Sequence, residues 1–181
     1  MFAPRQPVSA CPGVVLGIDP GLTRCGFAAL RASGGTVEVV ALGVLTTSKG
    51  DDVAQRLATL HTDFTALLDE IAPTTVAVER IFFQSNVSTA MSVAQASGVV
   101  LALASARGLP VAQYSPSQVK SAVAGSGSAD KLAVQKMVQR RLGLSALPEP
   151  ADAADAAAIA LCHLAASPLT SSIASAQGAS A

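Results

Sequence analysis

The sequence contains few cysteines and no long apolar run. Cys11, Cys25 and Cys162 are an odd number without paired spacing, which argues against a disulfide framework or a zinc knuckle and indicates a reducing cytoplasm. Although 50% of the residues are hydrophobic, no apolar run approaches the roughly 20 residues that a membrane-spanning helix needs. We therefore expect a cytoplasmic protein. Its predicted organisation is a disordered leader over residues 1–13, a single globular domain over 14–166 and a flexible tail over 167–181.

The sequence also lacks an excess of charge of either sign, with 12 basic and 12 acidic side chains. A neutral chain by itself argues against nucleic-acid binding, but the distribution of the charges changes this interpretation. Residues 80–141 contain seven Lys or Arg and one acid, whereas residues 142–181 contain three acids and no Lys or Arg. A basic middle next to acids predicts a phosphate-facing surface beside a metal site, and a solvated face without a partner is the alternative.

Apolar runs rich in β-branched residues alternate with segments of helical spacing. Strands are predicted at residues 14–18, 25–30, 37–46, 75–79 and 111–114, and helices at 51–71, 88–106, 128–142 and 151–166. Residues 115–127 are interpreted as a loop with one helical turn, and Ser128 as the cap of the helix that follows. Because Gly21 and the Gly34-Gly35 pair mark reversals, the first three strands are expected to form two antiparallel hairpins. The order of elements predicts an α/β fold, a mixed five-stranded sheet with helices on both faces.

The predicted helix over residues 88–106 is apolar around most of its circumference. Small residues such as Ala90, Ala94, Gly98 and Ala102 are mixed with Val, Leu and Met. We expect one face to pack on the sheet, and the opposite face must also be covered because its exposure to water is unfavourable. Either a second copy of the chain or ordinary burial under a loop would provide this cover.

Four carboxylates stand at strand ends or on one helix face, where the fold can direct them to a shared point. Asp19 ends the first apolar run within Gly-Ile-Asp-Pro-Gly, and Glu79 ends the run Val-Ala-Val. Asp152 and Asp155 are three residues apart, so in a helix they share one face. If the first and fourth strands are neighbours, Asp19 and Glu79 emerge side by side, and the acid pair of the last helix can lie over them.

Each of these acids also has a purely structural interpretation. Asp19 begins a good tight-turn sequence, and Glu79 can be an ordinary strand end paired with Arg80. Asp152 and Asp155 can be a helix cap and a first-turn acid that the helix dipole favours. The conjunction of all four makes these separate interpretations less convincing than a common site.

A cluster of four carboxylates predicts a site for divalent cations. The carboxylates repel one another when no cation is bound, so some of them must take up protons or bind metal. Oxygen-only ligands favour Mg²⁺ or Mn²⁺ over zinc. Two such ions suit phosphodiester hydrolysis, in which one activates water and the other stabilises the leaving 3′-oxygen.

A nucleophilic Ser or Cys activated by His has little support in this sequence. His61 falls in the middle of a predicted helix and is expected to face solvent. His163 adjoins Cys162 on a helix, where adjacent side chains diverge.

Five motifs in this order resemble the RuvC family of Holliday junction resolvases over about residues 14–166. They are Gly-Ile-Asp-Pro-Gly at 17–21, Val-Glu-Arg-Ile-Phe-Phe at 78–83, Gln-Val-Lys at 118–120, Gly-Ser-Gly-Ser-Ala-Asp-Lys at 125–131 and Asp-Ala-Ala-Asp-Ala at 152–156. The resemblance implies a ribonuclease H-like fold, a homodimer and metal-dependent paired nicking of four-way DNA junctions, with two Mg²⁺ or Mn²⁺ per active site. It also implies a branch-migration motor of the RuvA and RuvB type as a partner.

The same resemblance implies roles for individual residues. Asp19, Glu79, Asp152 and Asp155 match the four catalytic, metal-binding positions of the family. Phe82 matches the aromatic residue that stacks at the opened junction centre, and its alternative is a core position, which we assign to Phe83. Lys120 and Lys131 match basic residues that contact DNA near the scissile phosphate, and Arg80 is a further candidate DNA contact or a solvated surface residue. Stacking of a base on Phe82 can contribute about 1 to 3 kcal/mol.

Three other functions remain open from the sequence alone. The segment Gly-Ile-Asp-Pro-Gly-Leu-Thr also resembles the phosphate loop of actin-like and sugar-kinase-like nucleotide-binding phosphatases, which need two such domains to enclose a nucleotide. A ribonuclease H that acts on RNA:DNA hybrids would share the acidic site. A junction-binding scaffold without nuclease activity is disfavoured because all four acids are present.

Overall fold

The computed structural model describes residues 13–80 and 87–178, with side chains described for 13–80 and 90–166. A mixed five-stranded sheet has the strand order β3-β2-β1-β4-β5. The strands are β1 (Val14–Asp19), β2 (Arg24–Ser33), β3 (Thr36–Thr46), β4 (Thr75–Glu79) and β5 (Val111–Tyr114). The helices are α1 (Val53–Ile71), α2 (Val87–Ala106), α3 (Pro116–Ala124), α4 (Lys131–Arg141) and α5 (Ala151–Gly178).

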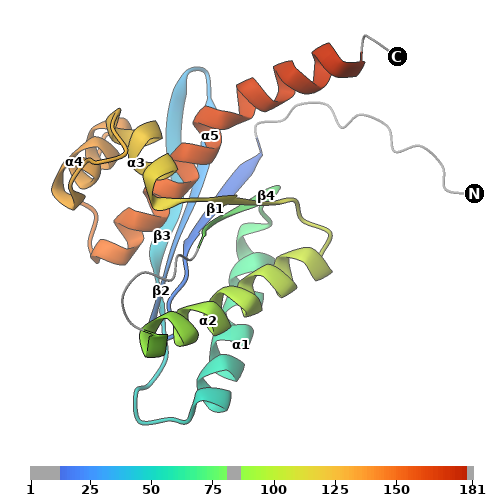
Figure 1. Ribbon diagram of the computed structural model, residues 1–181, viewed down its shortest axis with the longest axis vertical. Coiled ribbons are helices and arrows are strands. Elements are labelled where there is room, and N and C mark those ends of the chain that lie inside the picture. Colours follow the sequence, from blue (N-terminus) through green and yellow to red (C-terminus); the bar gives the residue numbers. More distant parts are fainter. Residues whose placement is uncertain (1–12, 81–86, 179–181) are drawn as a thin grey trace, which may run out of the picture.

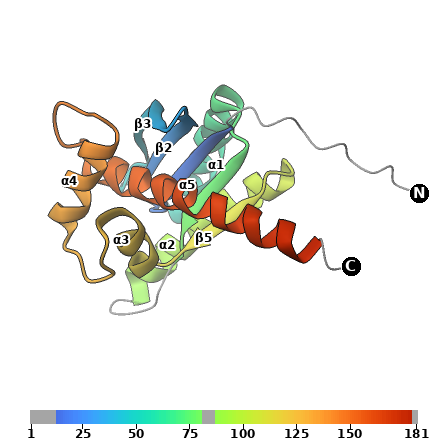
Figure 2. The ribbon, with the colours of Figure 1, turned by 90° about the horizontal axis from the view of Figure 1, so that it is seen from above.

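Helices cover both faces of the sheet, as the sequence predicts (Figure 1). The helices α1 and α2 pack on one face, and α3, α4 and α5 lie on the other, which Figure 2 shows from above. The two predicted hairpins are present, because β1 pairs with β2 and β2 pairs with β3, both antiparallel. The crossovers through α1 and α2 then place β4 and β5 parallel to β1.

Two apolar clusters, one on each face, hold these layers together. Alternate residues of each strand point to opposite faces, so Val14, Leu16 and Ile18 pack with α1 and α2. The intervening Val15 packs with α5 in the other cluster, as does Ala77 of β4. The alternation continues to the ends of the strands and therefore decides which helices the last residue of each strand faces.

Local sequence signals explain most of the helix boundaries. Asp52 caps α1 through a capping box with Gln55, and Ala72 ends the helix in the left-handed conformation just before Pro73. Ser115 and Gln118 form a second capping box at the start of α3. The interpretation of residues 115–127 as a loop with one helical turn is therefore wrong, since nine of them form a regular helix.

Two further boundaries differ from the prediction. Asp130, rather than Ser128, caps α4, because its carboxylate accepts a hydrogen bond from the backbone N–H of Ala133. The helix α5 continues to Gly178, whereas the sequence pattern placed its end near Ala166. Alanine has the highest helix propensity and is abundant before Pro168, but residues 169–178 contain only two alanines, so composition does not explain the extension.

The helix α5 approaches the sheet so closely that glycine is needed beneath it. A Cβ atom at Gly26 of β2 would overlap the carbonyl oxygen of Asp152, and one at Gly17 of β1 would overlap the carbonyl oxygen of Ala156. The helix backbone thus rests directly on the two strands. This contact fixes the height of the first turn of α5 above the strand ends.

We expect Gly26→Ala to lower the free energy of unfolding by about 1 to 3 kcal/mol, the usual range for overpacking. The added methyl group must push away the backbone at Asp152, because no flexible side-chain end fills that space. Urea unfolding measures the change. Gly50→Ala is the matched control, since a Cβ there meets only the Ser48 hydroxyl oxygen at 3.5 Å. Equal stability of the two variants would contradict the close packing.

Within the described part of the chain, no helix is long and apolar enough to cross a membrane.

Candidate active site

Strand alternation brings two of the predicted acids together. In β1, Asp19 lies two residues after Gly17, so both residues are on the face of the sheet toward α5. In β4, Glu79 lies two residues after Ala77 and is on that same face. The strands are parallel neighbours, with Ile18 opposite Val78, so Asp19 and Glu79 end adjacent strands side by side. The predicted neighbour relation between the first and fourth strands is confirmed.

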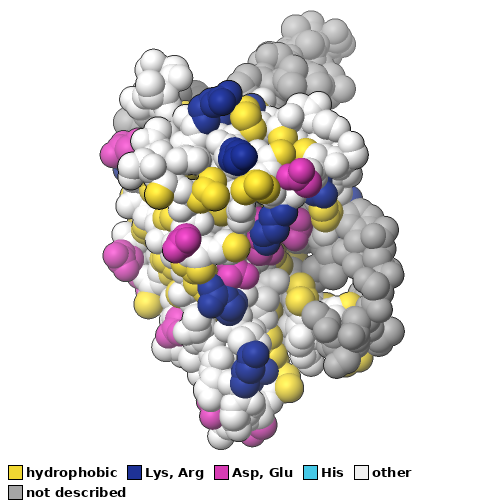
Figure 3. Space-filling model, turned by 90° about the vertical axis from the view of Figure 1, so that its left-hand side faces the viewer, with side chains coloured by type: hydrophobic (Ala, Val, Ile, Leu, Met, Phe, Trp, Pro, Cys, Tyr) yellow, Lys and Arg dark blue, Asp and Glu magenta, His cyan; other side chains and the backbone are white. Residues whose placement is uncertain are grey.

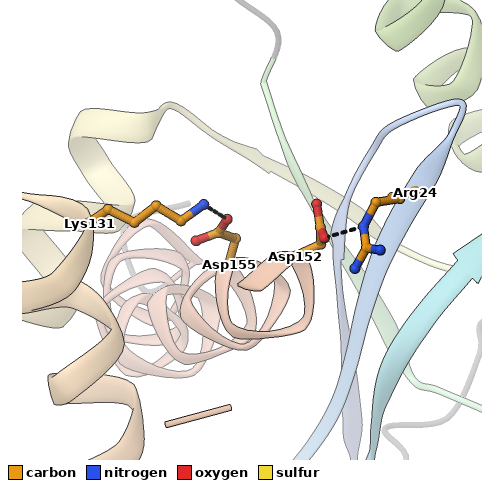
Figure 4. Close-up of polar contacts among 4 residues, drawn as sticks. All are labelled: Arg24, Lys131, Asp152 and Asp155. Atoms are coloured by element: carbon orange, nitrogen blue, oxygen red, sulfur yellow. Dashed lines mark hydrogen bonds and ion pairs between the residues drawn. The ribbon is translucent and has the colours of Figure 1, made fainter. Parts of the chain in front are cut away.

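The other two acids come from the first turn and a half of α5. Asp152 and Asp155 lie on the side of the helix that faces the strand ends (Figure 4). The contact of α5 with Gly17 and Gly26 sets their height over the sheet. The negative charges of both acids act on Asp19, which shows that three distant segments converge.

A cavity of about 250 Å³ contains most of the predicted site. Its polar lining consists of Asp19, Glu79 and Asp155 together with two lysines, Lys120 from α3 and Lys131 from α4. Asp152 lies beside this cavity rather than in its lining. The structure therefore groups three acids and both predicted DNA-contacting lysines in one place, with the fourth acid at the edge.

Burial and mutual repulsion strongly perturb the acids at the strand ends. Desolvation, followed by the charges of Glu79, Asp155 and Asp152, raises the pKa of Asp19 from 3.8 to about 7. Desolvation, followed by the charge of Asp155, also raises the pKa of Glu79. Such shifts identify sites where negative charge is held against its electrostatic preference, which is the condition that a bound cation relieves.

Two cations in the structure offset part of this negative charge. The Lys131 Nζ atom donates a hydrogen bond to Asp155 Oδ2 at 2.6 Å, and the Arg24 Nε atom donates one to Asp152 Oδ2 at 2.7 Å (Figure 4). The hydrogen bond to Asp155 raises the pKa of Lys131. Each acid of α5 thus has its own basic partner, while Asp19 and Glu79 have no ion-pair partner within the described residues.

The donor set fits Mg²⁺ or Mn²⁺, because all four candidate ligands are carboxylates and the buried Asp19 is held near excess negative charge. Within the described residues, no group of three Asp, Glu, His or Cys side chains is already arranged around one point at metal-ligand distances. The ion pairs explain this, since they direct Asp152 toward Arg24 and Asp155 toward Lys131.

Two predicted site residues remain, Arg80 and Phe82. Arg80 is exposed just after β4 and does not line the cavity, and its backbone N–H donates a hydrogen bond to the Tyr114 carbonyl. Phe82 and Phe83 lie outside the described residues. Sequence reasoning missed Arg24, the basic partner of Asp152. No sequence signal identified it, because its contact with Asp152 depends on the close packing of α5 on Gly26.

Among the described residues, the Cys and His side chains do not form a nucleophilic pair. The Cys162 Sγ atom donates to the Gln118 carbonyl, whereas His163 Nδ1 meets the Tyr114 hydroxyl at 2.9 Å, so the two side chains diverge as predicted. Burial raises the pKa of Cys162, and it raises the pKa of the other buried thiol, Cys25, to about 12. Both thiols are therefore poor nucleophiles at neutral pH. His61 is exposed on α1, also as predicted.

Two cavities larger than the acidic one lie away from the four acids. One of about 530 Å³ lies between α3, α5 and Tyr114, and one of about 660 Å³ lies between α4, α5 and the β2–β3 hairpin. Neither contains a carboxylate in its lining. The chemistry of the smaller acidic cavity, rather than cavity size, identifies the candidate active site.

Fold and acidic cavity together define a nuclease of the ribonuclease H-like class. The chain belongs to the RuvC family of crossover junction endodeoxyribonucleases, the Holliday junction resolvases. The sequence model of this family matches residues 15–163. A RuvC of Frankia alni is 53% identical over 151 residues, which are 83% of this chain and 77% of that protein. A RuvC of Rhodococcus jostii is 49% identical over 168 residues, 92% of this chain and 89% of that one. The structure of Thermus thermophilus RuvC in complex with a Holliday junction substrate matches with a TM-score of 0.82 and 38% identity, and covers 87% of this chain and 96% of that one.

Proposed function

We propose that two copies of this chain bind one four-way DNA junction and cut two strands of like polarity at symmetrical positions. The cuts leave 5′-phosphate and 3′-hydroxyl ends, which a ligase can seal during recombination and repair. The observation that carries this proposal is the acidic cavity at the ends of β1 and β4, with lysines from α3 and α4 in its wall. The junction-bound Thermus thermophilus relative supports the choice of substrate.

The four acids are proposed as the catalytic, metal-binding residues. Asp19 and Glu79 provide fixed oxygen ligands from the rigid sheet, and Asp152 and Asp155 provide ligands from α5. Two Mg²⁺ or Mn²⁺ ions bound there would supply an activated water and stabilise the leaving 3′-oxygen. The protein's own contribution is to hold four carboxylates in a partly buried cavity, where their electrostatic interactions are stronger than in water.

The basic side chains are proposed to hold the scissile strand. Lys120 and Lys131 project from two different helices into the acidic cavity, so a phosphate placed over the acids meets positive charge from two sides. Phe82 is proposed to stack on an unpaired base at the junction centre, as the resemblance implies. Arg80 is proposed as a more distant DNA contact, which its exposure permits.

The exposed side of α2 is proposed as the dimer surface. The helix buries Ala96, Val100 and Ala104 against the rest of the protein, while the Met91 side chain is 57% exposed. A second copy would cover this apolar side, and a junction with two-fold symmetry would then meet two equivalent cavities. A single linear duplex cannot engage both halves at once, which gives selectivity for branched DNA.

Two further expectations follow from the family resemblance. A branch-migration motor of the RuvA and RuvB type is the proposed partner, and the cytoplasm is the proposed site of action. The buried free thiols Cys25 and Cys162 are compatible with a reducing compartment.

The proposed substrate is tested by incubating the protein and Mg²⁺ or Mn²⁺ with a labelled four-way junction, a linear duplex and an RNA:DNA hybrid. The proposal predicts paired nicks at symmetrical positions in the junction and no comparable cleavage of the other two. Preferential cleavage of the hybrid would instead assign a ribonuclease H activity. Strong junction binding without nicks would indicate a scaffold.

We expect the double change Lys120→Ala and Lys131→Ala to weaken junction binding and flatten its salt dependence. Each lost phosphate contact should reduce the slope of log K against log salt by about 0.9. Fluorescence anisotropy with a labelled junction at several salt concentrations measures both quantities. Arg31→Ala is the control, since Arg31 lies at the opposite end of β2 and pairs with Glu38. An unchanged slope in the double variant would remove both lysines from the DNA-binding surface.

A further inference from the structure

Arg24 begins β2 at the mouth of the acidic site. It precedes Gly26 by two residues on the face toward α5, which places its side chain beside the first turn of that helix. Its Nε atom contacts Asp152 Oδ2 at 2.7 Å, and its side chain is 46% exposed. The guanidinium therefore lies at the boundary between the acids and solvent.

The contact with Asp152 uses only a small part of the hydrogen-bonding capacity of Arg24. In Figure 4 the ion pair joins Asp152 to Nε alone. Within the described residues, no hydrogen bond involves either terminal nitrogen of Arg24. A guanidinium aligned through Nε keeps its two terminal amino groups available, and these are the donors that bind a phosphate in bidentate fashion.

The acids of α5 hold two cations from opposite walls of the site. Asp155 binds Lys131, which approaches from α4, and Asp152 binds Arg24, which approaches from β2 (Figure 4). Each of the two cations thus forms an ion pair with one of two acids that are three residues apart on α5. Lys120 and Lys131 provide positive charge on the side of the site formed by α3 and α4. Arg24 provides positive charge on the opposite side, which is formed by β2.

A DNA strand that places one phosphate over the acids brings its neighbouring phosphates to both sides of them, because each strand carries a charge every 3.4 Å along the helix axis. The uncompensated acids repel those neighbouring phosphates. Figure 3 shows Lys and Arg side chains interspersed with Asp and Glu side chains on one face of the protein. Positive charge on the β2 side is therefore needed to hold the strand across the site.

We infer that Arg24 is a substrate-positioning residue that binds a backbone phosphate of the cleaved strand on the β2 side of the acids. This inference rests on the proposed junction substrate. Asp152 acts as the aligning partner, and the exposed ion pair is weak enough for the terminal amino groups to serve a phosphate. A purely electrostatic role, in which Arg24 only neutralises Asp152, is the competing explanation.

The test combines Arg24→Gln with Asp152→Asn, singly and together. Binding of a synthetic four-way junction is measured in EDTA, so that no metal-dependent cleavage occurs, by fluorescence anisotropy over a range of salt concentrations. A phosphate contact predicts that Arg24→Gln weakens binding by about tenfold and lowers the salt slope by about 0.9. The same loss must appear when Asp152 is already Asn, because the phosphate contact does not depend on the charge of Asp152.

Three outcomes decide the inference. If the effect of Arg24→Gln disappears in the Asp152→Asn background, Arg24 only neutralises Asp152 and the inference is overturned. If the wild type binds the junction and Arg24→Gln binds it equally well, the inference also fails while the proposed function stands. If the wild type does not bind the junction, the proposed function itself fails.

Two further variants make the result independent of folding and of general charge. Arg24→Lys keeps the charge but not the planar fork, so we expect the salt slope to be retained and the affinity to fall by a few-fold. Arg31→Gln makes the same charge change on the same strand, away from the acids, and should leave affinity and slope unchanged. A loss of binding in Arg31→Gln equal to that in Arg24→Gln would overturn the local contact.

Discussion

Asp19→Asn should reduce junction cleavage by more than about 100-fold while junction binding stays within about twofold of wild type. Even partners that only support metal ligands are worth 10- to 100-fold in activity, and Asp19 is proposed as a ligand itself. Binding persists because it depends on Lys and Arg contacts to phosphates, and a neutral Asn removes repulsion from the site. Nicking rates and anisotropy with the same labelled junction measure the two effects.

The matched control for this variant is Asp51→Asn. Asp51 is exposed in the segment before α1, outside the acidic cavity, so the same substitution there changes an aspartate away from the site. It should cleave and bind like wild type. Normal nicking by Asp19→Asn would remove the metal-site assignment, whereas loss of both binding and cleavage would show that Asp19 supports the fold.

The stability of the metal-free protein should fall as the pH rises from about 4 to about 7. The pKa of Asp19 is about 7 in the folded protein and 3.8 ordinarily, so within this window the folded state binds a proton that the unfolded state has lost. The contribution of this bound proton to the free energy of unfolding is fully present below pH 3.8 and is lost as the pH rises through about 7. At 1.36 kcal/mol per pKa unit, the full loss is on the order of 4 kcal/mol, or about 10 °C in Tm.

This pH effect is isolated by comparing wild type with Asp19→Asn in EDTA. Asn resembles the protonated acid, so the variant should show a smaller decrease and should be more stable than wild type at pH 8. Titrating groups that the substitution does not affect contribute equally to both proteins and cancel in the comparison. Mg²⁺ should raise the Tm of wild type more at pH 8 than at pH 5, because binding must first displace the proton of Asp19. If the Tm of the two proteins changed with pH in the same way, the pKa of Asp19 would not be raised in the folded protein.

The position of the acids on the strands was predictable because it depends on short-range rules. Asp19 and Glu79 end apolar runs, and strand alternation directs both to the α5 face once β1 and β4 are neighbours. Three-residue spacing likewise predicts that Asp152 and Asp155 share a face of α5. These features require only the period of each element and one pairing of strands.

Features that depend on competing local signals or on long-range packing were harder to predict. Gly and Ser around α3 suggested a loop, although the Ser115 and Gln118 capping box was present in the sequence. The pairing of Arg24 with Asp152 joins residues 128 positions apart and depends on the close approach of α5 to Gly26. Sequence spacing alone gives no measure of that distance, so neither this ion pair nor the orientation of Asp152 could be derived from it.

Titration of the protein with Mn²⁺, followed by the electron paramagnetic resonance signal of the free ion, tests the central claim most directly. If the four acids form a divalent-metal site, wild type should remove about two ions per chain from solution near pH 8 and Asp19→Asn should remove fewer at the same concentrations. Binding by wild type should weaken toward pH 5, where Asp19 is protonated. Equal Mn²⁺ uptake by wild type and Asp19→Asn at every concentration would contradict the account.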